Sequence, residues 1–270
     1  TQRLSGSGQK TAGPLMDEYS ERFGGIARLY GTAGLEKLRA ANVAVIGVGG
    51  VGSWTAEALA RSGVGKLTLV DLDEVCVTNT NRQIHALKGA TGKAKVDELS
   101  ARIASINPDC NVITIQKFFT EETAESILKG GFSYLVDAID GLSNKCLLLD
   151  ECRKREIPVI TCGAAGGRRD GTAIRIADLT RAKYDKLLFK VRKQLRQKHG
   201  FPRGTKKWNL ACVFSQEPVM YPQADGTVCE EKSIENGSMK LDCEGGLGAA
   251  TQVTGTFGFA AAGYVIQELV

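Results

Sequence analysis

The sequence lacks any C-x-x-C pair. Its eight cysteines stand singly along the chain: Cys76, Cys110, Cys146, Cys152, Cys162, Cys212, Cys229 and Cys243. This absence excludes the usual spacings of zinc ribbons and of thioredoxin-like redox motifs. We therefore expect reduced, mostly buried thiols in a cytoplasmic protein. For Cys243, a reactive thiol in a mobile loop and an incidental cysteine both stay open.

The first residues also lack the apolar core of a signal peptide. They are polar and rich in Gly and Ser, so we expect a disordered tail over residues 1–16, with Met16 as an alternative start. The apolar C-terminal stretch, 246–269, contains Thr251, Gln252 and Thr254, which favours an embedded core helix over a membrane span. Peripheral association of this stretch with a membrane stays open.

Residues 42–73 carry the strongest local signal. An apolar run from Val43 to Ile46 leads into glycines and then into a helical stretch, and a second apolar run ends on Asp71. The glycines match G-x-G-x-x-G, a pattern that lets the backbone approach a phosphate: Gly47, Gly49, Gly50 and Gly52. Asp71 stands where an acid can bind a ribose. NAD and ATP are both compatible with this turn.

Short apolar runs alternate with helical stretches through residue 162. This alternation predicts a Rossmann-like, doubly wound, mostly parallel α/β sheet over residues 17–162. We expect residues 163–270 to form an extension on the same core, with an antiparallel strand near 173–179 and a basic helix. Residues 200–246 show little regular pattern, which predicts a functional or partly disordered segment.

Several polar residues follow the glycine turn and favour a triphosphate over NAD. Arg82 and Lys95 can neutralise phosphate charge, Asn79 lies nearby in the chain, and Asp140 ends a later strand where it can bind Mg²⁺. A ligand role and a turn-capping role both stay open for Asp73. We interpret Lys145 as an exposed helix lysine rather than a phosphate ligand. An NAD-dependent oxidoreductase remains the alternative.

The positive charge of the chain is concentrated between residues 181 and 207. This segment holds eleven Lys and Arg and one acid, Asp185, although the whole chain carries only +5. Apolar residues at helical spacing allow one face to pack while the other binds a polyanion. The candidate RNA-binding residues are Lys183, Lys190, Arg192, Lys193, Arg196, Lys206 and Lys207. Trp208 is a candidate for stacking on an unpaired base.

These motifs resemble the adenylating domain of the ubiquitin-activating-enzyme superfamily. The resemblance rests on G-x-G-G-V-G-S at 47–53, D-x-D at 71–73, N-x-x-R-Q at 79–83, G-K-A-K at 92–95 and D-A-I-D ending at 140. It implies that Asp71, Asn79, Arg82, Lys95 and Asp140 bind ATP and Mg²⁺ and that a carboxylate is activated as its adenylate. The missing C-x-x-C pairs argue against a ubiquitin-like carrier protein as substrate. Arg22 and Arg28 are both candidates for the arginine that reaches a neighbouring active site in such relatives.

Further stretches resemble one branch of that superfamily, the tRNA threonylcarbamoyladenosine dehydratases. They are RFGGIARLYG at 22–31, VCVTNTNRQIHAL at 75–87, VFSQEPVMYPQADGTVC at 213–229 and GLGAAT at 246–251. This resemblance implies ATP-dependent cyclisation of a threonylcarbamoyl group on tRNA, a homodimer, a cysteine desulfurase or sulfur-acceptor system as a partner, and no DNA partner. An activator of a small carrier protein and a non-catalytic RNA-binding module remain alternatives.

Overall fold

A single seven-stranded sheet organises the protein. The computed structural model describes residues 17–204, 206–231 and 246–270. The strand order is β3-β2-β1-β4-β5-β7-β6, and all neighbours are parallel except β7 and β6. The strands are β1 Asn42–Ile46, β2 Lys66–Val70, β3 Asn111–Ile115, β4 Tyr134–Asp137, β5 Val159–Cys162, β6 Ile174–Asp178 and β7 Ala211–Ser215. The predicted doubly wound, mostly parallel α/β fold is confirmed.

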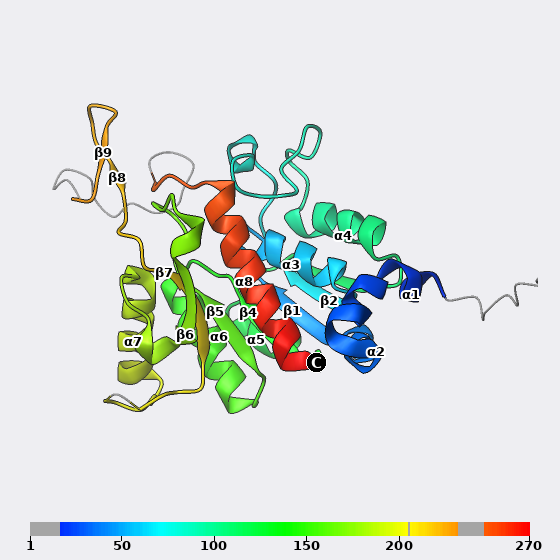
Figure 1. The fold of residues 1–270 in the computed structure, drawn as a ribbon. Coiled ribbons are helices and arrows are strands. Elements are labelled where there is room, and N and C mark those ends of the chain that lie inside the picture. The colour runs from blue at the N-terminus through cyan, green and yellow to red at the C-terminus, as the bar shows by residue number, and fades with distance from the viewer. Residues whose placement is uncertain (1–16, 205, 232–245) are drawn as a thin grey trace, which may run out of the picture.

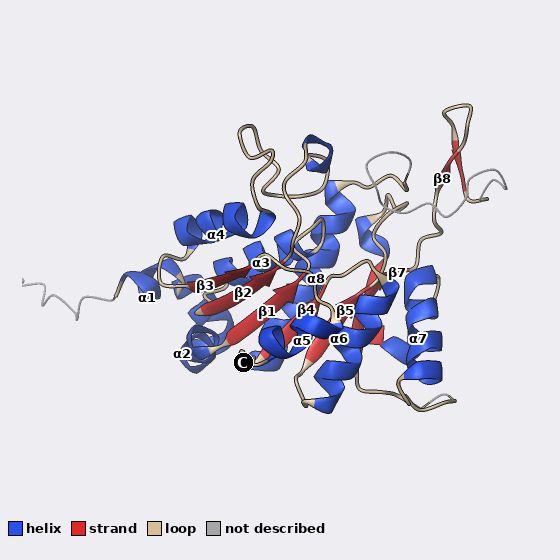
Figure 2. Ribbon diagram, turned by 180° about the vertical axis from the view of Figure 1, so that it is seen from behind, coloured by secondary structure: helices blue, strands red, loops and turns tan. Residues whose placement is uncertain are grey.

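Helices cover both faces of this sheet. The helices α3, α4 and α8 lie on one face and α5, α6 and α7 on the other (Figures 1 and 2). The bounds are α1 Glu18–Arg22, α2 Gly24–Ala40, α3 Gly52–Arg61, α4 Lys95–Ile106, α5 Glu121–Leu128, α6 Leu142–Lys154, α7 Lys186–Lys198 and α8 Thr251–Leu269. A small hairpin, β8 Tyr221–Pro222 with β9 Val228–Cys229, stands apart from the main sheet.

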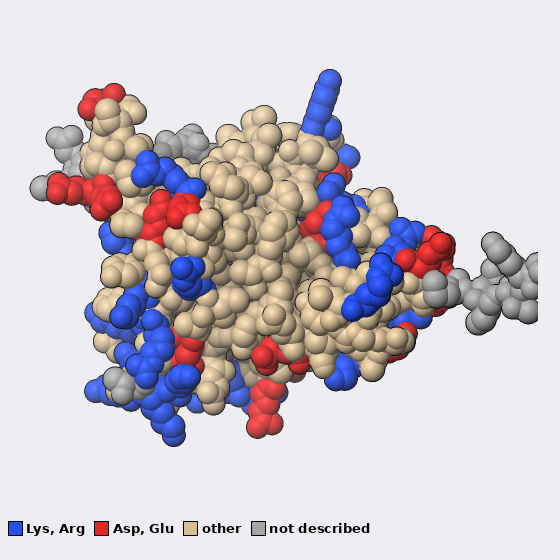
Figure 3. Space-filling model, viewed as in Figure 1, with Lys and Arg blue, Asp and Glu red and all other residues tan. Residues whose placement is uncertain are grey.

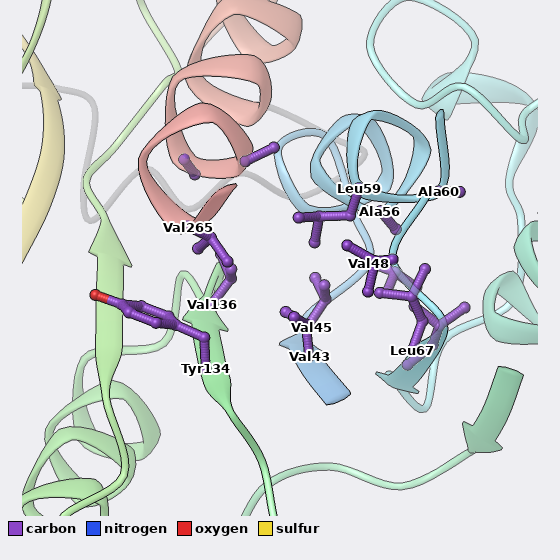
Figure 4. Close-up of a cluster of buried hydrophobic side chains, with 14 of the residues drawn as sticks. Val43, Val45, Val48, Ala56, Leu59, Ala60, Leu67, Tyr134, Val136 and Val265 are labelled. Atoms are coloured by element: carbon purple, nitrogen blue, oxygen red, sulfur yellow. The ribbon is translucent and has the colours of Figure 1, made fainter. Parts of the chain in front are cut away.

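The main core lies between the sheet and the α3–α8 layer. Alternate residues of the central strands, such as Val43 and Val136, pack against Leu59 of α3 and Val265 of α8 (Figure 4). The prediction of an embedded C-terminal core helix is confirmed, because Phe257 and Val265 of α8 are fully buried. None of the described helices is long and apolar enough to cross a membrane.

The region after residue 162 extends this sheet. The predicted antiparallel strand near 173–179 is β6, and it pairs with β7. The expectation of little regular structure over 200–246 is wrong for Ala211–Ser215, because β7 is a strand paired with β5 on one side and β6 on the other. The predicted tail over residues 1–16 and Cys243 lie outside the described residues.

None of the seven cysteines in the described residues forms a disulfide. Cys146, Cys152, Cys162 and Cys212 are buried, and the other three described cysteines are half-buried. Burial raises the pKa of Cys152 and of Cys162 to about 12, so these thiols are protonated near neutral pH. The prediction of reduced, mostly buried thiols is confirmed for the described residues.

Candidate nucleotide-binding site

The turn between β1 and α3 requires glycine at two positions. Gly47 has a φ of +86°, and a Cβ there would lie 2.9 Å from the carbonyl oxygen of Ala138. A Cβ on Gly52 would lie 1.8 Å from the carbonyl oxygen of Gly47. The turn therefore folds tightly on itself, and the N-terminus of α3 begins inside it. The first N–H groups of a helix have no intrahelical partner, so this end favours an anion such as phosphate.

Asp71 is fastened to that turn. It follows the last residue of β2, and its Oδ2 atom accepts a hydrogen bond from the N–H of Val48 at 2.8 Å. Its Oδ1 atom accepts one from the N–H of Asp73 at 2.9 Å. Burial raises the pKa of Asp71, although nearby Lys95 and these two N–H donors oppose the shift. The structure thus brings the predicted ribose acid to the predicted glycine turn.

Two cations lie beside the turn. Lys95 begins α4 with a side chain that is only 7% exposed, and its Nζ atom is 2.7 Å from Oδ2 of Asp73. Arg82 packs its aliphatic part near Gly50, where an added Cβ would be 3.5 Å from Cγ of Arg82. The guanidinium of Arg82 donates to the carbonyl of Thr78 at 2.9 Å. Both predicted phosphate ligands are therefore close to the turn.

Asn79 and Asp73 have local partners in the structure. The Oδ1 atom of buried Asn79 accepts from the N–H of Cys76 at 3.0 Å, which fixes the loop that carries Arg82. Asp73 is exposed and pairs with Lys95, as described above. In this structure, both residues thus shape the surroundings of the cations.

Asp140 lies on a neighbouring turn at the same edge of the sheet. This turn follows β4, and the N–H of Ala138 donates to the carbonyl of Ile46 at 2.9 Å, next to the glycine turn. Asp140 is exposed. No group of three or more His, Cys, Asp or Glu that could hold a metal occurs among the described residues. A lone carboxylate fits Mg²⁺, which usually takes its other ligands from substrate phosphates and water.

The interpretation of Lys145 as an exposed helix lysine is wrong. Its side chain is fully buried, and its Nζ atom lies 2.7 Å from Oδ2 of Asp137, the last residue of β4. Thr161 donates to the same oxygen at 2.6 Å, and the N–H of Ile139 donates to Oδ1 at 3.1 Å. This buried network fixes the turn that carries Asp140. Sequence reasoning missed Asp137 and Thr161, although an acid that ends an apolar strand is a usable signal.

The predicted basic helix is α7, which begins at Lys186 because Asp185 caps it. Oδ1 of Asp185 accepts from the N–H of Leu188 at 2.8 Å. Lys and Arg gather over α7 and the loop after it, at the lower left of Figure 3. The candidates Lys183, Lys190, Lys193, Lys206 and Lys207 are exposed, whereas Arg192 and Arg196 are half-buried and donate to backbone carbonyls. We call these seven residues the basic surface.

A groove of about 570 Å³ lies between α5, α6 and α7. Its lining includes Thr120, Asn144 and Lys198, and it contains none of the predicted nucleotide-binding residues. The candidate nucleotide site is thus defined by the turns at the edge of the sheet and not by this groove.

The chain is similar to known proteins over nearly its whole length. The sequence matches the ThiF family over residues 22–269. A tRNA threonylcarbamoyladenosine dehydratase of Escherichia coli K12 is 46% identical over 257 residues, which are 95% of this chain and 96% of that protein. The enzyme of the same name from Haemophilus influenzae is 46% identical over 94% of this chain and 95% of its own length.

A solved structure is also similar to this chain over nearly its whole length. It is the E. coli tRNA N6-threonylcarbamoyladenosine dehydratase TcdA in complex with ATP. It is 42% identical, superposes with a TM-score of 0.84, and the match covers 94% of this chain and 96% of that one. The similarity therefore extends over both the glycine-turn region and the region after residue 162.

Proposed function

The chain belongs to the ThiF family, and we propose that it catalyses the ATP-dependent dehydration of N6-threonylcarbamoyladenosine in tRNA to the cyclic form. The observation that carries this proposal is the bond from the N–H of Val48 to Asp71, with Lys95 and Arg82 beside the same turn. It joins a ribose acid, a phosphate-binding turn and two cations. Relatives that cover nearly the full chain bear the corresponding enzyme name, and one was solved with ATP.

The reaction needs two chemical steps. The threonine carboxylate attacks the α-phosphate of ATP, and pyrophosphate leaves. The carbamoyl group of the same side chain then attacks the activated acyl carbon, AMP leaves, and the ring closes. The nucleoside loses the elements of water, which end in AMP and pyrophosphate. Charge builds up first on phosphorus and then on the acyl oxygen, so prepositioned cations lower the barrier.

Each site residue then has a role in this proposal. Asp71 accepts hydrogen bonds from the ribose, and the turn with Gly47, Gly49, Gly50 and Gly52 holds the phosphates. Arg82 and Lys95 stabilise the charge on the phosphates. An incoming phosphate competes with Asp73 for the ammonium group of Lys95, which is already desolvated by burial. Asn79 supports the loop of Arg82.

Asp140 is the proposed ligand of Mg²⁺. When bound, Mg²⁺ supplies charge neutralisation to the phosphates of ATP. Asp137 and Lys145 hold the turn from which the Asp140 carboxylate projects. The proposal assigns Asp140 to metal binding and the buried pair beneath it to positioning.

The tRNA and other partners belong to the same proposal. The basic surface contacts phosphates of the tRNA backbone, because exposed lysines give salt-dependent affinity for a polyanion. From the family resemblance we also propose a cytoplasmic homodimer and a cysteine desulfurase or sulfur-acceptor system as a partner. Sedimentation of the purified protein tests the dimer.

The test of the activity is pyrophosphate exchange into ATP. We expect exchange that requires tRNA carrying threonylcarbamoyladenosine, and we expect none with unmodified tRNA. Arg82→Ala and Asp140→Ala should abolish exchange and leave the melting temperature unchanged, because both side chains lie at the surface edge of the sheet. Near-normal exchange in either variant would contradict the assigned site. Exchange that depends on a carrier-protein C-terminus would instead support the alternative of a carrier-protein activator.

A further inference from the structure

Tyr184 combines two features that each cost free energy. Its φ is +59°, in the left-handed region that side chains other than glycine rarely adopt. It is also 66% exposed, although it carries a large aromatic ring. It stands directly before Asp185, the N-cap of α7. Strained backbone of this kind persists only where the surrounding structure holds it.

A buried arginine holds this turn from beneath. Arg168 is only 2% exposed, and its guanidinium donates to the carbonyl of Tyr184 at 3.0 Å. Burial lowers the pKa of Arg168, although the nearby carboxylates of Asp185 and Glu217 oppose the shift. Asp185 fixes the other side, because its Oδ2 atom accepts from the N–H of Ala164 at 2.9 Å. The position of Tyr184 is thus set by buried Arg168 and by Asp185, which also caps α7.

A second exposed ring lies on the first half of α7. Phe189 is 60% exposed, and the guanidinium carbon of Arg192 lies 5.9 Å from its ring centroid. Lys183 and Lys190, which each neighbour one of the two rings in sequence, are exposed. Exposed rings and exposed lysines therefore occur together at the start of α7.

Trp208, the aromatic residue that the sequence suggested for stacking, is already engaged. Its ring lies 4.8 Å from that of Phe201, between centroids, and Arg196 lies over it at 5.2 Å. Its Nε1 donates to the carbonyl of Pro202 at 3.1 Å. The ring is part of the packing beneath the basic surface, which leaves Tyr184 and Phe189 as the exposed rings of this region.

We propose that Tyr184 and Phe189 form an aromatic platform on which unpaired bases of the tRNA substrate stack. This rests on the proposed function, since it specifies how the same enzyme holds its RNA. Aromatic rings beside lysines suit single-stranded nucleic acid, because every base has a π-face and every nucleotide a phosphate.

The platform also lies at the correct edge of the sheet. Asp185 contacts Ala164, two residues after the end of β5, and β5 is the parallel neighbour of β4, which leads to Asp140. The carboxyl ends of parallel strands meet at one edge, so Tyr184 and the nucleotide site share it. The platform and the nucleotide site can therefore contact the same tRNA from one edge of the sheet.

The experiment measures binding of fluorescent single-stranded RNA and of a fully paired RNA of equal length, without ATP. Tyr184→Gly removes the ring and accepts the positive φ freely, so its melting temperature should equal or exceed that of the wild type. Phe189→Ala removes the second ring from an exposed site. Phe259→Ala is the control, because Phe259 is also an exposed ring (50%) but lies on α8.

We expect the Kd for single-stranded RNA to rise about 5- to 150-fold in Tyr184→Gly and in Phe189→Ala, the range found when a stacking ring is removed. The Kd for paired RNA and the salt dependence of binding should stay at the wild-type values in these two variants. In Phe259→Ala, the Kd for single-stranded RNA should stay at the wild-type value as well. Unchanged single-strand affinity in both variants, or an equal loss for paired RNA, would overturn the platform. Tighter binding of the wild type to anionic vesicles than to RNA, lost in the same variants, would assign the rings to a membrane instead.

The proposed function and the platform fail in different experiments. If the proposed function is wrong, the wild-type protein shows no pyrophosphate exchange with modified tRNA. The comparison of single-stranded and paired RNA still decides whether the rings stack on bases.

Discussion

The buried pair of Lys145 and Asp137 sets the geometry of the site from below. Both side chains are fully buried, and the carboxylate of Asp137 accepts from Lys145, Thr161 and the N–H of Ile139. A buried charge is tolerated only while its partner is present. Each member of the pair therefore stabilises the fold mainly by neutralising the buried charge of the other.

The first prediction concerns the loss of that partner. Lys145→Met should lower the free energy of unfolding by about 3–5 kcal/mol, because it leaves the Asp137 carboxylate buried and unpaired by a cation. Urea denaturation measures this. Lys154→Met on the same helix is the control, since Lys154 is 53% exposed and its ion pairs are worth at most about 1 kcal/mol. If the two substitutions lowered the free energy of unfolding equally, burial would not make the Lys145–Asp137 pair more important than an exposed pair.

The second prediction concerns pH and His85. Burial lowers the pKa of His85 to about 4, nearby Lys95 lowers it further, and Glu98 opposes the shift. The folded state thus binds the proton more weakly than the unfolded state, so stability is full above a pH of about 6.5 and is lost as the pH falls towards 4. The loss should approach about 3 kcal/mol.

Denaturation of the wild type and of His85→Gln at pH 7 and at pH 4.5 measures this contribution. The raised pKa values of Asp71 and Asp185 act in the opposite sense in both proteins, so they cancel in the difference. The chain has only two histidines. If His85→Gln loses as much stability as the wild type over this interval, then His85 does not titrate as described.

Residues near the glycine turn could be predicted from the sequence because their spacing is fixed by local geometry. Asp71 follows Gly52 after one helix and one strand, and it accepts a hydrogen bond from Val48 within the turn. Lys145 could not be predicted, because its depth depends on how α6 packs over the end of β4. Helical spacing predicts which face of a helix a residue occupies. It does not predict that a carboxylate on a neighbouring strand will pair with that residue.

At the scale of elements, α8 packs against α3 beside the glycine turn. Gly258 allows a close approach of the two helices: an added Cβ would lie 2.7 Å from the carbonyl oxygen of Val51 and 2.9 Å from the N of Thr55. Val51 is the N-cap of α3. The spacing of α8 therefore bears on the helix end that is proposed to hold phosphate.

The third prediction tests this contact. Gly258→Ala should lower the free energy of unfolding by about 1–3 kcal/mol, because the methyl group meets backbone that cannot move aside. It should also weaken ATP binding, measured by calorimetry. Gly263→Ala on the same helix should instead gain about 0.5–1 kcal/mol, since its Cβ would meet nothing within 4 Å and alanine favours helix. A loss of stability in both variants, or in neither, would contradict the close packing at Gly258.

Most elements could be predicted from their patterns, but β7 could not. Strands β1, β2 and β4 are apolar runs that precede an obvious turn, whereas Ala211–Ser215 lies within a stretch rich in Gly, Pro and polar residues. Its strand conformation comes from pairing with β5 and β6, which are distant in sequence. Tertiary pairing of this kind leaves little trace in the local sequence.

For the whole molecule, the distribution of charge separates two kinds of binding. The residues from 181 to 207 carry a large excess of Lys and Arg, while the rest of the chain is net acidic. Lysines on the basic surface are proposed to contact phosphates, whereas the two exposed rings contact bases. Only the first contribution depends on salt.

The fourth prediction follows from that difference. In Lys190→Ala/Lys193→Ala, the plot of log affinity for tRNA against log salt concentration should become shallower by about 1.4–1.8, which is the loss of two phosphate contacts. Filter binding at several salt concentrations measures the slope. Lys66→Ala serves as the control, because Lys66 begins β2, far along the chain from the basic surface. An unchanged slope in the double variant would remove these lysines from the tRNA interface.

The central claim is that one site uses ATP to remove water from a nucleoside in tRNA. The most direct measurement is mass spectrometry of nucleosides from tRNA carrying threonylcarbamoyladenosine, after incubation with the protein, ATP and Mg²⁺. The account predicts a nucleoside lighter by one water, formed in equal amount to AMP and absent with Arg82→Ala. AMP formed without any change in the tRNA nucleosides, or a lighter nucleoside formed without ATP, would contradict it.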